Sequence, residues 1–201
     1  TRLLDRLLCD LYGPQHTVKE GWVPAALLHG SGSFLRPCHE LHPPGGRHLY
    51  LHAVDLARRP DGQWCVLADR TQAPSGAGYA LENRIILSRV LPDEFRECGV
   101  ARLAGFFAGL RDGLRAAAPR PAGTPNVVLL TPGPYNETYF EHAYLARYLG
   151  FPLVEGGDLT VRDRRVYLKT LEGLRPVDVI LRRVDDTFCD PLELRSDSTL
   201  G

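Results

Sequence analysis

Several features are absent from this sequence of 201 residues, and each absence excludes a class of protein. The formal net charge is zero, so nothing indicates a nucleic-acid-binding surface or a polybasic membrane patch. No apolar run reaches the ~18 to 20 residues that cross a membrane, and no secretory signal precedes the helical pattern at the start. We therefore expect a cytoplasmic protein that binds neither nucleic acid nor membrane. Methionine is also absent, which leads us to expect a piece of a longer chain.

Cysteine is sparse and shows no paired spacing. The five cysteines are odd in number and form no CxxC pair, so reduced thiols are favoured over a disulfide framework. Cys38, His39 and His42 lie close together in the sequence. Their spacing matches no standard zinc finger, and the Pro-Pro-Gly-Gly that follows is typical of a loop. The zinc interpretation is therefore the weaker one.

The first part of the sequence predicts helices on either side of a hairpin. Apolar residues at positions 3, 4, 7, 8 and 11 form a helical stripe, which Tyr12-Gly13-Pro14 ends. Residues 48–56 and 63–67 are predicted strands, joined by the strong turn signal Arg59-Pro60-Asp61-Gly62. Pro92 starts a long predicted helix, because apolar residues repeat at helical spacing as far as Leu114.

The pattern changes after residue 125 and predicts a small open α/β sheet. A strand over 126–130, a helix from an Asn136 N-cap to Leu149 and a strand over 151–154 form a predicted parallel βαβ unit. Gly150 ends the predicted helix. Further strands are predicted at 159–161 and 166–169, which form a hairpin, and at 177–181.

Residues 69–84 are the most informative segment of the sequence. They follow a predicted strand and combine two arginines, two carboxylates, amides, a serine and two glycines in sixteen residues. Gly76 and Gly78 allow the backbone to approach a ligand closely or to take a positive φ, and Pro74 stiffens the turn. A connecting loop has little use for so many polar groups, so this segment indicates an anionic, phosphorylated ligand.

Two further groups of polar residues lie near predicted strand ends. The loop before Asn136 follows a parallel strand, where open α/β sheets bind ligands, and a helix N-terminus there attracts anions. On the predicted helix, Glu137 and Glu141 share a face beside His142, which suits a cation or an amine but equally a solvated surface. Arg182-Arg183-Val184-Asp185-Asp186 ends a strand and suits either a carboxylate or phosphate clamp or an internal cluster of ion pairs.

These motifs, taken together, resemble the circularly permuted ATP-grasp proteins, bacterial relatives of glutathionylspermidine synthase and glutathione synthetase. The resemblance is carried by residues 69–84, 130–142, 153–159 and 180–186, in one order along nearly the whole chain. It implies an α/β fold, with a partial ATP-grasp subdomain containing an antiparallel hairpin and a small Rossmann-like (pre-ATP-grasp) open sheet. The implied domains are the N-terminal part of the permuted ATP-grasp domain at 1–117, a linker at 118–125 and a Rossmann-like substrate-side domain at 126–201.

The resemblance also implies a chemistry. Such enzymes join a carboxylate to an amine through an acylphosphate made from ATP, and Mg²⁺ and cationic groups neutralise the phosphates. The implied partners are small-molecule or peptide carboxylates and amines, together with the remaining ATP-grasp subdomain of a full-length chain. The alternative is a non-catalytic ATP-grasp-like module that binds a peptide or a partner protein.

The expected site residues fall into four groups. Arg182, Arg183 and Asp185 are the candidate catalytic residues, and Asn136, Glu141 and His142 are the candidate substrate-binding residues. The candidate nucleotide-binding residues are Arg70, Gln72, Ser75, Gly76, Asn83 and Arg84, and the candidate metal ligands are Asp69 and Glu82.

The sequence departs from the family pattern at one place. Many relatives have Glu-Asp-Asn, then Arg, before the shared Pro-Ser-Gly, whereas this chain has Ala68, Asp69 and Arg70, then Gln72. An arginine cannot coordinate Mg²⁺, which prefers oxygen ligands. This departure puts the usual metal site in doubt more than the fold.

Overall fold

The computed structural model describes residues 1–119, 123–192 and 194–200. The chain folds into two compact units, Thr1–Gln72 and Ala73–Gly201. The linker expected at 118–125 lies partly outside the described residues, and the family domain limits stay a prediction. In the described part of the chain, no helix is long and apolar enough to cross a membrane.

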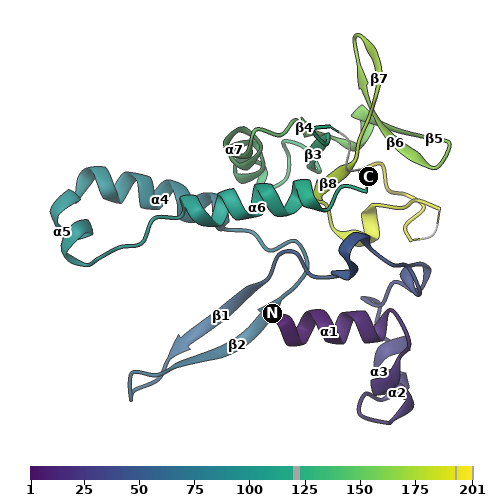
Figure 1. The fold of residues 1–201 in the computed structure, drawn as a ribbon, viewed down its shortest axis with the longest axis horizontal. Helices are drawn as coiled ribbons and strands as arrows, with labels where there is room; N and C mark the ends of the chain where they lie inside the picture. Colours follow the sequence, from purple (N-terminus) through teal and green to yellow (C-terminus); the bar gives the residue numbers. More distant parts are fainter. Residues whose placement is uncertain (120–122, 193, 201) are drawn as a thin grey trace. The chain divides into compact units, whose positions relative to one another are not determined.

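The first unit combines short helices with a two-stranded hairpin (Figure 1). Helix α1 (Arg2–Leu11) ends at Tyr12, as predicted. Strands β1 (Ala53–Arg58) and β2 (Trp64–Arg70) pair antiparallel, which confirms the predicted hairpin. The unit also contains α2 (His16–Lys19), α3 (Ala25–His29) and the 3₁₀ turns η1 (Arg36–Cys38) and η2 (Pro44–Gly46).

The start of the first strand was predicted five residues too early. The amides of His48 and Leu49 both donate to a carboxylate oxygen of Asp5, at 2.9 Å each. These amides therefore tie the segment to α1 and not to β2. The second strand is longer than predicted and includes Asp69 and Arg70, so the informative segment begins inside a strand.

The second unit begins with three helices, α4 (Ala77–Val90), α5 (Pro92–Glu97) and α6 (Ala104–Ala116). The single long helix predicted from Pro92 is wrong, because the chain turns at Gly99, where φ is +59°. A positive φ is incompatible with a continuing right-handed helix and is readily adopted by glycine. The apolar stripe of α6 is nevertheless real, since Phe107 and Leu114 are buried.

A three-stranded parallel sheet forms the centre of the second unit. Its order is β4 (Leu153–Val154), β3 (Val127–Leu130) and β8 (Val179–Arg182), and β3 is buried along its whole length. Helix α7 (Tyr139–Leu149) crosses between β3 and β4, which confirms the parallel βαβ unit, and Gly150 ends it in the left-handed conformation. Helices α6 and α7 contact this sheet (Figure 1).

A second, antiparallel sheet follows in the chain. It consists of β5 (Leu159–Arg162), β6 (Arg165–Thr170) and β7 (Gly173–Pro176), of which the first two form the predicted hairpin and the third was not predicted. The 3₁₀ turns η3 (Gly156–Asp158) and η4 (Asp186–Phe188) follow β4 and β8. The fold is thus mixed α/β, with both parallel and antiparallel sheets.

The predicted N-cap of α7 is wrong by two residues. The side-chain oxygen of Asn136 accepts hydrogen bonds from the amide and the hydroxyl of Thr138, at 2.9 and 2.7 Å. Such a local turn competes with helix formation, so Thr138 becomes the N-cap and the helix begins at Tyr139. Glu137 therefore lies before the helix, and the expected helical pairing with Glu141 does not occur.

Candidate functional site

The three parallel strands of the second unit end at one edge of the sheet. Thr131 follows β3, Glu155 follows β4 and Arg183 follows β8. Main-chain hydrogen bonds continue past the strands here, from Thr131 to Val154 at 2.9 Å and from Arg183 to Leu130 at 2.8 Å. The carboxyl edge of an open parallel sheet is where α/β proteins bind ligands. This edge is therefore the first part of the candidate site.

A buried carboxylate connects this sheet to the start of α4. Glu141 on α7 is 1% exposed. Its side-chain oxygens accept hydrogen bonds from the amides of Gly76, at 2.8 and 2.9 Å, and Gly78, at 2.8 Å. The N-terminus of a helix carries about half a positive charge, so the Glu141 carboxylate neutralises the start of α4 from inside the protein.

Arg183 contacts the same loop at Pro74. Its Nη1 donates to the carbonyl of Pro74 at 3.0 Å, and the residue is 9% exposed. Burial lowers the pKa of Arg183, and the negative charge of Glu141 opposes that shift. We call the Pro74–Gly78 segment, held by Glu141 and Arg183, the clamped loop. Two charged residues that the sequence singled out separately thus act on one segment.

His142 lies beside Glu141 on α7 and is equally buried. Its two ring nitrogens form hydrogen bonds with the hydroxyls of Thr131, at 2.9 Å, and Thr138, at 3.0 Å. Burial, with a smaller effect of Arg183, lowers the pKa of His142 to about 4, and Glu141 opposes this. The ring is therefore neutral near pH 7, and it fixes the loop that leaves β3.

The low pKa of His142 predicts an acid sensitivity of the second unit. Between its ordinary pKa of ~6.5 in the unfolded chain and about 4 in the folded protein, only the unfolded chain takes up the proton. The contribution of His142 to stability is then complete well above pH 6.5 and is lost as the pH falls from there to about 4. From pH 7 to pH 5 we expect this histidine to lower the free energy of unfolding by about 2 kcal/mol.

Urea unfolding of wild type and His142→Gln at pH 7 and pH 5 measures this effect. Hydrogen exchange of the β3 amides is the readout, because these amides belong to the second unit. No other histidine contributes to the pH dependence of the second unit, because every other histidine of the sequence lies before residue 73. The variant is expected to lose the pH-dependent difference, and an equal fall in both proteins would contradict the assignment.

The strand end at Glu155 was not singled out from the sequence. Gly133 in the β3–α7 loop has φ +103°, and a Cβ built there would lie 3.2 Å from Oε2 of Glu155. Glu155 also forms a capping box with Asp158 at the start of η3. The signal that could have indicated this contact is the glycine itself, because it occupies a loop that closely approaches another strand end.

The other candidate residues of the second unit are spread more widely. Ser75 is exposed on the clamped loop, next to Gly76. Arg84 lies on α4, eight residues beyond Gly76, which corresponds to about 12 Å along the helix at 1.5 Å per residue. Its Nη1 donates to the carbonyl of Ala101.

Arg182 donates to the carbonyl of Val184. Asn83 and Asp185 are exposed, Glu82 is half-buried, and Asn136 is engaged with Thr138.

Glu82 has a specific neighbour on α7. Burial, together with a hydrogen bond to Glu82, raises the pKa of Tyr144 to about 12. The phenol thus stays protonated at physiological pH. Glu82 as a metal ligand stays a prediction.

The candidate residues of the first unit lie on the hairpin and its end. Asp69 forms a 2.8 Å hydrogen bond with Nε2 of His52. Arg70 donates through Nε and Nη2 to Asp55, with a shortest distance of 2.7 Å, and this contact lowers the pKa of Asp55. Gln72 is exposed. The partners His52 and Asp55 were missed, because cross-strand neighbours depend on a register that the sequence alone did not fix.

The residues present do not complete a metal site within the described part of the chain. No group of three or more histidine, cysteine, aspartate or glutamate side chains there could hold an ion. Asp69 and Glu82 belong to different units. The roles of Asp69 and Glu82 as ligands stay predictions.

Comparison with known proteins shows several relatives. The chain is 47% identical over 201 residues to an uncharacterized protein of Mycobacterium tuberculosis, covering all of this chain and 23% of that relative. It is 42% identical over 200 residues to an uncharacterized protein of Synechocystis, covering 42% of it, and to a second from M. tuberculosis, covering 36%. The chain thus spans less than half the length of each of these relatives. The family model for circularly permuted ATP-grasp type 2 matches residues 1–201, and the chain belongs to that family.

Proposed function

We propose that this chain is part of an ATP-dependent carboxylate–amine ligase, which forms a C–N bond through an acylphosphate. Family membership supports ligase-type chemistry at a coarse level. The observation that carries the proposal is the clamped loop, which Glu141 and Arg183 hold in the same unit as the carboxyl edge of the parallel sheet. A preorganised loop with exposed polar groups is what phosphoryl transfer requires, because positioning and electrostatics supply most of the catalysis.

We assign different roles to the residues of this site. Ser75 and the exposed side of the clamped loop bind phosphate, with Asn83 and Arg84 further along α4. Arg182 and Asp185 at the end of β8 face the carboxylate or its phosphorylated form. Glu141, His142 and Arg183 act as positioning residues. The carboxylate of Glu141, both ring nitrogens of His142 and Nη1 of Arg183 are bonded to the loops that they hold.

The second unit supports the binding of ATP more than the binding of Mg²⁺. The cations and exposed polar groups of the second unit fit a nucleotide phosphate, and bound ATP would supply the phosphoryl group that activates the carboxylate. The described residues do not form a magnesium site by themselves. We propose that any further ligands belong to the remaining ATP-grasp subdomain of the longer protein.

Calorimetry of the full-length protein with Mg-ATP tests the proposal. We expect saturable binding at millimolar ligand or below. Arg182→Gln is expected to slow ATP-dependent phosphate release at least about a hundredfold, the effect of one missing preorganised donor. Arg162→Gln, an exposed change on β5, is the matched control and should leave the rate unchanged. If Mg-ATP does not bind at all, the ligase proposal is wrong.

The second candidate is a non-catalytic module that binds a peptide or a partner protein. It is favoured by Ala68 and Arg70, which replace two residues of the family's metal-binding pattern, and by the pairing of Arg70 with Asp55. The double substitution Ala68→Glu and Arg70→Asn separates the two functions. A ligase that depends on Arg70 loses activity, whereas a binding module keeps its partner.

A further inference from the structure

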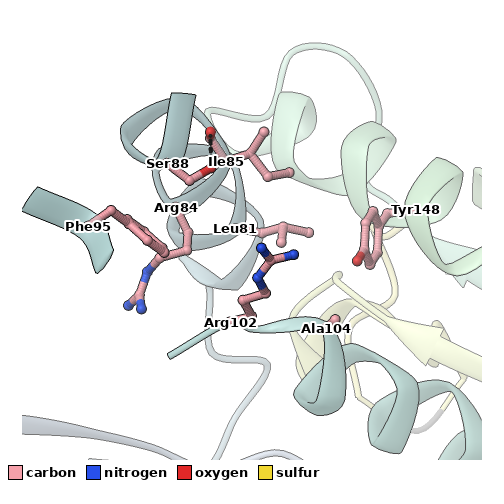
Figure 2. Close-up of a pocket in the computed structure, with 8 residues that line it drawn as sticks. All are labelled: Leu81, Arg84, Ile85, Ser88, Phe95, Arg102, Ala104 and Tyr148. Carbon is pink, nitrogen blue, oxygen red and sulfur yellow. Dashed lines mark hydrogen bonds between the residues drawn. The ribbon is translucent and has the colours of Figure 1, made fainter. Parts of the chain in front are cut away.

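A pocket of about 210 Å³ lies in the second unit, where α4, α5 and the start of α6 meet α7 (Figure 2). Its walls include Leu81 and Ile85 from α4 and Phe95 from α5, which are apolar. Its other described lining residues are Arg84, Ser88, Arg102, Ala104 and Tyr148. The volume corresponds to about seven water molecules at ~30 Å³ each. The pocket therefore suits a small molecule.

The charged groups among the described lining residues of the pocket are all positive. Arg84 and Arg102 both line it, and its described lining residues include no carboxylate. In the described part of the chain neither arginine forms an ion pair. Arg84 uses one of its donors on the carbonyl of Ala101 and retains others. Figure 2 shows the Arg102 head pointing toward Leu81 of α4. Two uncompensated guanidinium groups attract an anion.

The walls of the pocket are fixed by internal contacts. The hydroxyl of Ser88 donates to the carbonyl of Ile85 at 2.8 Å, so it can only accept from a ligand. The ring of Tyr148 packs edge-on against Phe107, with centroids 5.2 Å apart, and Phe107 is 2% exposed. Leu81 is 4% exposed. A largely apolar cavity with a few placed polar groups is typical of small-molecule sites.

We propose that this pocket binds a small carboxylate that carries an apolar group, through Arg102, a residue to which the proposed ligase reaction assigns no role. The Arg102 guanidinium, whose head points toward Leu81 (Figure 2), pairs with the carboxylate, because a planar carboxylate matches its donors. Leu81, Ile85 and Phe95 contact the apolar group. A phosphate fits less well, because it has three charged oxygens to satisfy and the pocket offers apolar walls on several sides.

Benzoate is the probe for this site. Benzamide, which lacks the charge, and acetate, which lacks the apolar ring, are the matched controls. The experiment follows the methyl NMR signals of Leu81 and Ile85 in the full-length protein. Benzoate is expected to shift them saturably in the millimolar range. Benzamide should bind at least about tenfold more weakly, because it loses a charge-assisted hydrogen bond. Acetate should also bind at least about tenfold more weakly, because it loses the apolar contacts of the ring.

Two variants locate the charge. Arg102→Gln, an exposed change, should weaken benzoate binding at least about tenfold. Arg89→Gln, an exposed change on α4 outside the pocket lining, should not. Equal binding of benzamide, equal binding of inorganic phosphate or an unchanged affinity in Arg102→Gln would each overturn the proposal. The absence of a benzoate-dependent shift at these methyl groups would overturn it as well.

Discussion

Replacing Glu141 by alanine is expected to lower the free energy of unfolding of the second unit by about 3 kcal/mol or more. The change removes the acceptor of the Gly76 and Gly78 amides, and each buried donor left without a partner costs about 1–3 kcal/mol. It also leaves the buried Arg183 without the negative charge that opposes its desolvation. Urea unfolding followed by circular dichroism measures the loss, and hydrogen exchange of the two glycine amides localises it.

Two further variants separate the hydrogen bonds from the charge. In Glu141→Gln a single amide oxygen can still accept from both glycines, because Oε1 lies 2.8 Å from each amide nitrogen. We therefore expect this variant to be intermediate, keeping the protected amides but losing the charge near Arg183. Glu137→Ala is the control, since Glu137 is exposed, and such surface changes stay within about 0.5 kcal/mol. If Glu141→Ala matches this control, Glu141 does not hold the loop.

The elements that the sequence predicted correctly depend on local signals. The hairpin between β1 and β2 follows from the turn at residues 59–62, and the βαβ unit follows from apolar runs around an amphipathic helix that a glycine ends. The errors arose where a distant residue decides the structure. Asp5 takes the amides of His48 and Leu49, which lie more than forty residues away, so a segment with strand-like composition does not pair.

The sequence identified residues of the candidate site but not the contacts between them. Glu141 and Arg183 were both expected to contact a ligand. In the structure both are hydrogen-bonded to the clamped loop. The contact between Gly76 and Glu141 joins residues 65 positions apart, and no periodicity in one sequence can indicate such a pair. Helical spacing even suggested a solvated face for Glu141, whereas packing of α4 on α7 makes this residue one of the most buried.

Gly78 is the one residue whose identity could have indicated this packing. A glycine inside a helix costs about 1 kcal/mol relative to alanine, so its presence in α4 requires a reason. A Cβ built on Gly78 would lie 2.8 Å from Cγ of Glu141. The absent side chain therefore allows the carboxylate to reach the amides at the start of the helix.

Gly78→Ala is accordingly expected to destabilise the second unit by about 2 kcal/mol, against the usual helix preference, because overpacking a tight contact costs about 1–3 kcal/mol. Glu141 cannot move aside cheaply, since its oxygens are bonded to Gly76 and to Gly78 itself. Urea unfolding gives the magnitude, and faster hydrogen exchange at Gly76 would show that the clamped loop has loosened.

Gly109→Ala supplies the matched control for this substitution. Gly109 also lies inside a helix, α6, but a Cβ there meets nothing within 4 Å. Alanine at this position should stabilise the unit by up to about 1 kcal/mol through helix propensity alone. The two glycine substitutions thus have opposite expected signs, about 3 kcal/mol apart. A stabilising Gly78→Ala would mean that Glu141 yields without cost, and the clamped loop would then lose the rigidity on which its proposed role in phosphate binding depends.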